Sequence, residues 1–227
     1  MNIFDSESNM DTLSLGTTIV AIKHKDGVIM ACDTRTASGS FVSDRSAIKG
    51  NMISPSIVNY GPIYVLRCGD AAASQVVTRY VYNYLHFHAM ELGSQGTIDL
   101  NTVATLYKNI CYSNKDSLQC AFIISNGKEI MSIDSSGAFF RHDLIASHGS
   151  GSAYISGLLH TNIRDNMSRE EVLSLLIKSV GYAIDYDGSS GGNINIYELD
   201  KNGSAKRTLY DHNQIEKVVY AFRDMKI

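Results

Sequence analysis

The sequence predicts an α+β fold, a four-layer αββα sandwich in which two antiparallel sheets pack face to face and a pair of helices covers each outer face. Strand-like and helix-like segments follow one another as strands, two helices, strands, two helices and strands, without the βαβ alternation of a parallel sheet. Tight-turn dipeptides join strand-like segments at Asp26-Gly27, Asn126-Gly127 and Ser136-Gly137. The 227 residues are 44% hydrophobic with only two prolines, which indicates one globular domain.

The first half of the chain predicts strands followed by two helices. Residues 17–23 and 28–32 are rich in β-branched and apolar side chains and predict a hairpin around Asp26-Gly27. Further strands are expected at residues 52–59 and 63–68, separated by Gly61-Pro62. Helical spacing then begins, and a helix over residues 71–90 places on one face Ala73, Val77, Val81, Tyr84, Leu85 and His88. A second helix carries a buried stripe of Leu100, Val103, Ala104, Tyr107, Ile110 and Cys111.

The second half predicts a strand meander, two helices and two final strands. The meander is expected at residues 121–125, 129–134, 138–141 and 144–147. A helix over residues 152–164 follows, and the capping box Ser168-Arg169-Glu170-Glu171 marks the start of another. The buried side chains of that helix are expected to be Val172, Leu175, Leu176, Val180, Ala183 and Ile184. Strands near residues 193–199 and 206–209 are expected to finish the chain.

Charge and hydropathy exclude several classes of function. A formal charge of −3 and a pI near 6.1 provide no basic field for nucleic acid or an anionic membrane. No run approaches the roughly 20 apolar residues that a membrane-spanning helix needs. The four cysteines form no CxxC pair and lie in or beside apolar stretches, which is typical of reduced structural thiols in a cytosolic protein.

The composition changes abruptly between Gly16 and Thr17. Residues 1–16 are polar and carry three acidic side chains but no Lys or Arg, so they match neither a secretory signal nor a mitochondrial leader. The chain from Thr17 onward has equal numbers of acidic and basic residues, and a neutral surface favours association. The junction therefore separates a leader from a structured domain.

Two local patterns suggest other chemistry, and their context argues against both. Residues 188–192 match the GxSxG pattern of an esterase, with Ser190 as nucleophile, but that elbow needs a strand before the serine and a helix after it. Here a predicted helix precedes Ser190 and a predicted strand follows. His86 and His88 are two residues apart on a helix, so they point in different directions and favour packing or solvation over metal binding.

The leader junction carries the most specific chemical pattern. Cleavage of the Gly16–Thr17 bond would give Thr17 a hydroxyl nucleophile and a free α-amine on one residue. Such an amine titrates at about 7.7–8.0 in model peptides, close enough to neutrality to act as a general base. A nearby lysine would lower the pKa of the amine or take the proton itself, and a carboxylate would hold the lysine. Asp33 and Lys49 are of the required types.

These residues resemble the catalytic beta subunits of the 20S proteasome, which are N-terminal-threonine hydrolases with an αββα fold. The likeness runs from Gly16 to about Leu209, and residues 17–39 (TTIVAIKHKDGVIMACDTRTASG) are similar to the opening hairpin of the family. Residues 148–157 (HGSGSAYISG) and 187–192 (DGSSGG) resemble its two later site loops, at the matching spacing.

The resemblance implies a role for each matching residue. Thr17 would be the nucleophile, with Asp33 and Lys49 as the charge pair beside it. The backbone N–H of Gly69 would face the developing oxyanion. The hydrogen-bonding residues around the α-amine would be Ser150, Asp187 and Ser190. No metal or other cofactor is implied.

Residues 67–72 (RCGDAA) resemble the caspase-like, post-acidic type of beta subunit. Arg67 would then pair with an acidic side chain before the scissile bond, since a guanidinium binds a carboxylate bidentately and repels lysine. Ala71 and Thr36 would complete the substrate pocket. An alternative is that Arg67 closes an ion pair at a sheet edge. The segment between Lys49 and Arg67 is a few residues longer than is usual in the family, and the extra length is expected in a hairpin connection.

The expected protein is therefore a threonine endopeptidase subunit with residues 1–16 as a propeptide removed by autolysis and residues 17–227 as one catalytic domain. Its implied partners are other alpha and beta subunits in stacked seven-membered rings and unfolded polypeptide substrates, in cytoplasm and nucleus and in ubiquitin-dependent degradation. Two alternatives remain. One is a structural ring subunit without catalysis, which would lack the threonine, the lysine or the glycine before the cut. The other is a separate amidohydrolase that acts alone on small amides.

Overall fold

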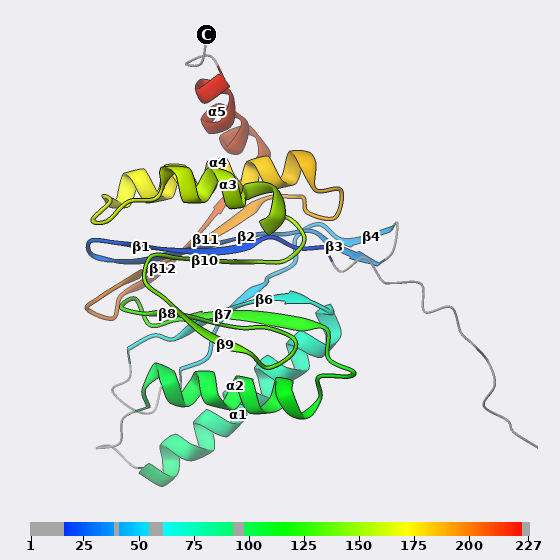
Figure 1. The fold of residues 1–227 in the computed structure, drawn as a ribbon, viewed down its shortest axis with the longest axis vertical. Coiled ribbons are helices and arrows are strands. Elements are labelled where there is room, and N and C mark those ends of the chain that lie inside the picture. Colours follow the sequence, from blue (N-terminus) through cyan, green and yellow to red (C-terminus); the bar gives the residue numbers. More distant parts are fainter. Residues whose placement is uncertain (1–15, 39–40, 55–60, 93–97, 224–227) are drawn as a thin grey trace, which may run out of the picture.

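The fold is a sandwich of two five-stranded antiparallel sheets with helices on both outer faces (Figure 1), as the sequence predicts. The computed structural model describes residues 16–38, 41–54, 61–92 and 98–223. The strands of the first half are β1 (Ile19–His24), β2 (Gly27–Asp33), β3 (Thr36–Ser38), β4 (Phe41–Asp44), β5 (Gly50–Met52) and β6 (Tyr64–Gly69). Those of the second half are β7 (Cys120–Ser125), β8 (Ile130–Ile133), β9 (Phe139–His142), β10 (Ile145–His148), β11 (Ile194–Asp200) and β12 (Ala205–Tyr210). The helices are α1 (Ala71–Leu92), α2 (Leu100–Ser113), α3 (Ser152–Asn162), α4 (Arg169–Tyr186) and α5 (His212–Arg223).

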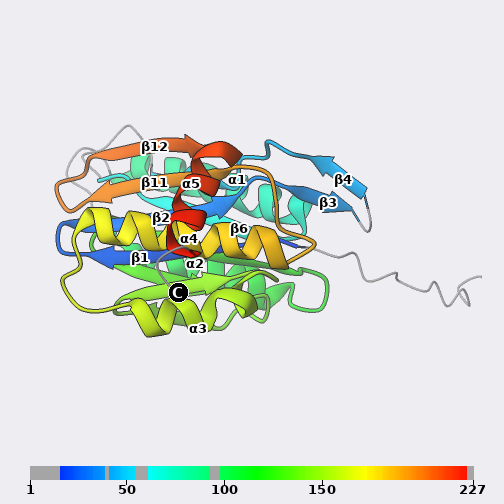
Figure 2. The same ribbon diagram turned by 90° about the horizontal axis from the view of Figure 1, so that it is seen from above.

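The two sheets are built from different parts of the chain. One has the order β10-β1-β2-β11-β12 and lies under α3 and α4, whereas the other has the order β5-β6-β7-β8-β9 and packs on α1 and α2. β3 and β4 form a separate two-stranded hairpin, which projects from one end of the sandwich in Figure 2. All pairings among the described residues are antiparallel.

Alternation along β1 explains why its first four residues, 19–22, are all apolar. Val20 and Ile22 point into the cluster beneath α3 and α4, while Ile19 and Ala21 belong to the cluster between the two sheets. Successive side chains of a strand face opposite sides, so a strand covered on both faces needs apolar residues throughout. β1 is therefore a central strand that holds the residue before it, Thr18, in a buried position.

Both ends of α4 are capped. At its start, Ser168 Oγ accepts a hydrogen bond from Glu171 N at 3.3 Å, and Glu171 Oε2 accepts one from Ser168 N at 2.8 Å, so the predicted capping box is confirmed. The helix ends at Tyr186, and Asp187 occupies the C-cap with its N–H donating to Ala183 O at 2.8 Å. Asp187 thus leaves the helix with its side chain directed into the sandwich end, where it is buried.

Three parts of the fold differ from the prediction. The strand expected at residues 52–59 is instead Gly50–Met52, because pairing with β6 sets its position, with Gly50 opposite Leu66; residues 55–60 lie outside the described part of the chain. The β3–β4 hairpin was not predicted, since its strands are only three and four residues long and β4 is exposed. The chain also does not finish in strands: α5 follows β12 and packs on α4, with Val219 and Ile215 close to Gly181.

The structure shows the state of the cysteines, the helices and the two neighbouring histidines among the described residues. All four cysteines are free thiols in buried positions, as predicted. No described helix is long and apolar enough to cross a membrane. His86 stacks on Tyr82 and His88 lies near Glu91, and no group of metal-ligating side chains gathers among the residues described.

Candidate active site

The predicted site residues meet at one end of the sandwich because of the antiparallel register. Ile19 at the start of β1 lies opposite Cys32 near the end of β2 and opposite His148 at the end of β10. Asp33 pairs in turn with Ile194 at the start of β11. The segments that enter or leave these strands at this end therefore converge, and they carry the candidate residues.

Thr17, Lys49 and Asp33 form one hydrogen-bonded cluster. Lys49 Nζ lies 2.7 Å from Asp33 Oδ1 and donates to Thr17 Oγ1 at 3.0 Å. The lysine and aspartate side chains are 5% and 0% exposed, so water barely screens their attraction. Thr17 Oγ1 itself donates to the carbonyl oxygen of Gly16 at 2.6 Å. The hydroxyl thus lies between a buried ammonium and the carbonyl of the bond proposed for cleavage.

The Asp33 carboxylate is held by four donors. Besides Lys49, its Oδ1 accepts from Thr18 N at 3.0 Å. Its Oδ2 accepts from Arg35 N at 3.2 Å and from Gly191 N at 3.0 Å. A buried carboxylate needs such partners to remain favourable, and here they come from four segments: those before β1, after β2, before β5 and between α4 and β11. Asp33 therefore fixes Lys49 and joins these segments.

A second chain of hydrogen bonds reaches Thr17 from the other side. Thr17 N donates to Ser150 Oγ at 3.3 Å, and Ser150 Oγ donates to Asp187 Oδ2 at 2.5 Å. Ser190 Oγ donates to the same Asp187 oxygen at 2.7 Å and lies 2.7 Å from Thr18 Oγ1. In this structure Thr17 N is the amide joined to Gly16. After cleavage the same nitrogen would be the α-amine, already beside Ser150.

Ser190 occupies a supporting position. The residues before it belong to α4 and those after it lead into β11, the order opposite to that of an esterase elbow. Its side chain is completely buried and hydrogen-bonded to Asp187. The esterase interpretation is thereby excluded.

Close packing requires glycine at two positions of this site. A Cβ on Gly16 would lie 1.6 Å from Ser189 Cβ, and a Cβ on Gly151 would lie 1.9 Å from Thr18 Oγ1. Neither Ser189 nor Thr18 can move away without a cost in free energy, because the hydrogen bonds of the site hold both residues in place. The glycines thus allow the leader and the loop after β10 to approach Thr17.

The remaining predicted residues line a small cavity of about 30 Å³ beside Thr17. Its walls include Thr36, Arg67, Gly69 and Ala71, all expected from the sequence. Arg67 N donates to Lys49 O at 3.0 Å, and β5 and β6 pair as antiparallel strands, so residues 53–63 connect the two strands of a hairpin. Residues 55–60 of that connection lie outside the described part of the chain, and the position of the extra length stays a prediction.

Arg67 is 8% exposed and makes no ion pair among the described residues. Its Nη2 donates to Ile48 O at 2.8 Å, and its Nη1 donates to Ser74 Oγ at 3.2 Å and Ala71 O at 3.5 Å. Burial lowers the pKa of this guanidinium. The sheet-edge ion pair considered from sequence is therefore wrong for the described residues: the charge is held by neutral acceptors and lacks a counter-ion.

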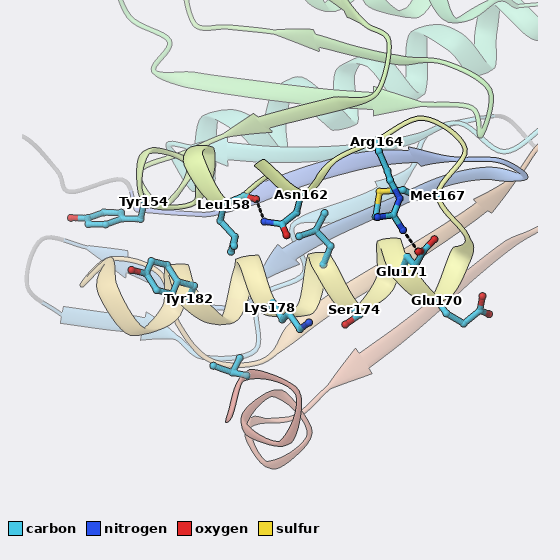
Figure 3. Close-up of a pocket in the computed structure, with 12 residues that line it drawn as sticks. Tyr154, Leu158, Asn162, Arg164, Met167, Glu170, Glu171, Ser174, Lys178 and Tyr182 are labelled. Carbon is cyan, nitrogen blue, oxygen red and sulfur yellow. Dashed lines mark hydrogen bonds and ion pairs between the residues drawn. The ribbon is translucent and has the colours of Figure 1, made fainter. Parts of the chain in front are cut away.

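A larger cavity lies elsewhere. It has a volume of about 960 Å³ and lies between α3, α4 and α5 on the outer face (Figure 3). Its wall includes the exposed ion pair of Arg164 and Glu171, and no predicted site residue lines it. Volume alone therefore does not locate the reactive groups.

Thr18, Arg35 and Ser74 lie at the site and were not assigned a role from sequence. Thr18 follows Thr17 directly and Arg35 lies two residues after Asp33, and both donate backbone N–H groups to the Asp33 carboxylate, so their closeness in sequence was an available signal. Ser74 bonds Arg67 from α1 and lines the small cavity, and no local pattern indicates that contact.

Comparison with known proteins adds an independent observation. The family model described as "Proteasome subunit" matches residues 13–199. The chain is 34% identical over 212 residues to the probable proteasome subunit beta type-1 of Schizosaccharomyces pombe, covering 91% of this chain and 90% of that protein. It is 33% identical over 208 residues to proteasome subunit beta type-6 of Dictyostelium discoideum, covering 89% and 93%. Identity to proteasome subunit beta type-1 of Saccharomyces cerevisiae is 34% over 204 residues, covering 87% and 90%.

Proposed function

Because this chain belongs to the proteasome subunit family, whose members assemble with one another and carry protease activity, we propose that it is a catalytic beta subunit with threonine chemistry. The observation that carries the proposal is the buried contact of Lys49 Nζ with both Thr17 Oγ1, at 3.0 Å, and Asp33 Oδ1, at 2.7 Å. An ammonium in this position stabilises negative charge as it develops on the hydroxyl oxygen.

Activation is proposed to occur at the Gly16–Thr17 bond. Thr17 Oγ1 attacks the Gly16 carbonyl carbon, the C–N bond breaks, and the nitrogen leaves as the α-amine of Thr17. Water then hydrolyses the resulting ester and releases residues 1–16. Support comes from the hydrogen bond of 2.6 Å between Thr17 Oγ1 and the Gly16 carbonyl oxygen, which keeps the two groups together.

Peptide cleavage is proposed to follow the same course on a substrate carbonyl. Thr17 Oγ1 bonds to the carbonyl carbon, its proton passes to one of two amines and from there to the substrate nitrogen, and the C–N bond breaks to release the amine product. Water then hydrolyses the acyl ester, which releases the acid product and restores the Thr17 hydroxyl. The two amines are the α-amine of Thr17 and Lys49 Nζ. Gly69 N–H is the proposed donor to the oxyanion, and Ser150, Asp187 and Ser190 orient the α-amine.

Acidic side chains before the scissile bond are the proposed preference, the caspase-like specificity. Arg67 supports this preference. Its guanidinium is nine-tenths buried and has no counter-ion among the described residues, so a substrate carboxylate would stabilise it more than a neutral side chain would. Arg67 also lines the small cavity with Thr17. The relatives named beta type-1 are consistent with this assignment.

The proposed setting is a 20S particle of stacked seven-membered alpha and beta rings, in cytoplasm and nucleus, acting on unfolded polypeptides. A non-catalytic structural subunit is the second candidate. It is disfavoured because Gly16, Thr17 and Lys49 are all present and the last two are in contact. An amidohydrolase acting alone is disfavoured by the family assignment.

The testing experiment is determination of the N-terminus and intact mass of this chain isolated from its native assembly. A chain that begins at Thr17 is expected, and Thr17→Ala should retain residues 1–16 and lose peptide cleavage. Thr17→Ser keeps a hydroxyl and should retain processing. A wild-type chain from a complete particle that still carries its leader, or an active Thr17→Ala particle subunit, would refute the threonine mechanism.

A further inference from the structure

A second cavity lies on the other side of Arg67. It has a volume of about 570 Å³ and is bounded by residues 48–53 and by the first three turns of α1. Neither Thr17, Lys49 nor Gly69 lines it, whereas Arg67 lines both this outer cavity and the small one beside Thr17. Arg67 therefore forms the wall between two spaces.

One donor of Arg67 is unused. The Nη atoms donate hydrogen bonds to Ile48 O, Ala71 O and Ser74 Oγ, but the buried Nε–H has no acceptor among the described residues. A buried donor without a partner costs free energy, and the cost is larger when the group is charged. The position thus favours a ligand that accepts a hydrogen bond and carries negative charge.

The outer cavity contains a second cation. Arg79 of α1 lines it and is exposed, and no ion pair ties its guanidinium to any described residue. Asn51, Gln75 and Thr78 supply neutral polar groups, and no acidic side chain is present in the described wall. Two guanidinium groups that share a cavity without a carboxylate create a positive potential there.

We propose that the outer cavity is an anion-binding site, in which a small oxyanion accepts the Nε–H of Arg67 and pairs with the guanidinium of Arg79. Its ligand class is a free anion with several acceptor oxygens, such as inorganic phosphate, because both cations offer N–H donors in a planar array. Binding there also neutralises part of the charge of the guanidinium that meets the substrate carboxylate, which weakens binding of an acidic substrate. This kinetic consequence rests on the proposed function, whereas the binding itself does not.

The direct test is anomalous diffraction from crystals of the assembled particle soaked in a concentration series of sodium selenate. A selenium peak is expected within hydrogen-bonding reach of Arg67 Nε and Arg79. Arg79→Gln should raise the selenate concentration for half occupancy by roughly tenfold, while Arg79→Lys, which keeps the charge, should raise it less. Lys128→Gln removes an exposed charge outside the cavity and should leave the occupancy unchanged.

Three results would overturn the proposal: no peak in the cavity, a peak only in the small cavity beside Thr17, or a carboxylate of a neighbouring subunit in the place of the anion. A kinetic measurement tests the effect of the bound anion on substrate cleavage separately from anion binding itself. Phosphate, compared with chloride at equal ionic strength, should raise KM for a peptide with glutamate before the cut and should do so less in Arg79→Gln. If selenate binds but acidic peptides are not cleaved, the proposed specificity fails and the anion site stands.

Discussion

Lys49 Nζ donates a hydrogen bond of 3.0 Å to Thr17 Oγ1 while it is paired with Asp33, so the hydroxyl of Thr17 is polarised by a buried ammonium. The lysine stands 32 residues from Thr17 in the chain, and the fold brings them together at the sheet end. Since both the donor and its counter-ion are buried, their positions are set before any substrate binds.

Replacing Lys49 separates its charge from its capacity to accept a proton. Lys49→Ala should abolish leader removal and peptide cleavage, because Asp33 loses its cationic partner and the hydroxyl loses its donor. Lys49→Arg keeps the positive charge, but a guanidinium stays protonated at neutral pH and cannot serve as the base. Intact mass and a pH–rate profile measure the outcome: an active Lys49→Arg chain assigns proton transfer to the α-amine, and an active Lys49→Ala chain contradicts any role for the lysine.

Arg67 should determine the preference for acidic substrates. Arg67→Met keeps most of the buried volume and removes the charge, so kcat/KM for a peptide with glutamate before the cut should fall by roughly 100-fold, the range for loss of a buried charged pair. The value for a leucine peptide should stay level or rise. Comparison of the two peptides on the same particles is the internal control, and an unchanged ratio would show that another residue reads the substrate.

Ser150 should affect turnover more than substrate binding. Ser150→Ala removes the acceptor of Thr17 N and one donor to Asp187, so the α-amine would lose its orientation. We expect kcat to fall by about 10- to 100-fold with KM little changed. Ser156→Ala, an exposed change in α3, serves as the control. A parallel loss of folding and activity in Ser150→Ala would indicate a structural role instead.

Gly16 should be required for leader removal. A Cβ there would lie 1.6 Å from Ser189 Cβ, so Gly16→Ala must displace the carbonyl from Thr17 Oγ1 and slow autolysis. Gly157→Ala adds a Cβ with no atom within 4 Å and should process normally. The fraction of precursor in newly assembled particles, followed by mass spectrometry, measures the difference. Equal processing in both variants would mean that the packing against Ser189 is irrelevant to cleavage.

Acid should destabilise the fold through two histidines, at the end of β9 in one sheet and at the end of β10 in the other. Burial lowers the pKa of His142 and His148, with their mutual repulsion adding to the effect at His148 and Asp134 opposing it. The unfolded chain therefore takes up protons as pH falls through about 6.5, before the folded chain does, and stability is lost below that pH. Thermal unfolding at pH 7.5, 6.5 and 5.5 should show a falling Tm, and His148→Gln should weaken the pH dependence. His160→Gln, at an exposed position, should not.

The sandwich was predictable because its signals are local. Apolar runs in β1 and β2 indicate strands buried on both faces, Asp26-Gly27 supplies the turn, and the capping box starts α4 one residue after Ser168. The same holds for the junction at Gly16 and Thr17, where composition changes within a few residues. By contrast, the short β3–β4 hairpin and α5 give weak signals, because packing against other elements decides whether such segments form.

The sequence alone determines which chemical groups the site can contain, whereas the tertiary structure determines which of them are hydrogen-bonded to one another. Residue types at and after the Gly16–Thr17 junction predicted a site of Thr17, Asp33 and Lys49, because a nucleophile, a cation and a carboxylate are properties of side chains. Ser150 lies 133 residues after Thr17 in the chain, and Asp187 lies a further 37 residues on. Only the antiparallel pairing of the strands could bring these three residues into one chain of hydrogen bonds. Likewise, the two-sided burial of Arg67 depends on how α1 meets β5 and β6, and no local sequence pattern encodes a contact between distant elements.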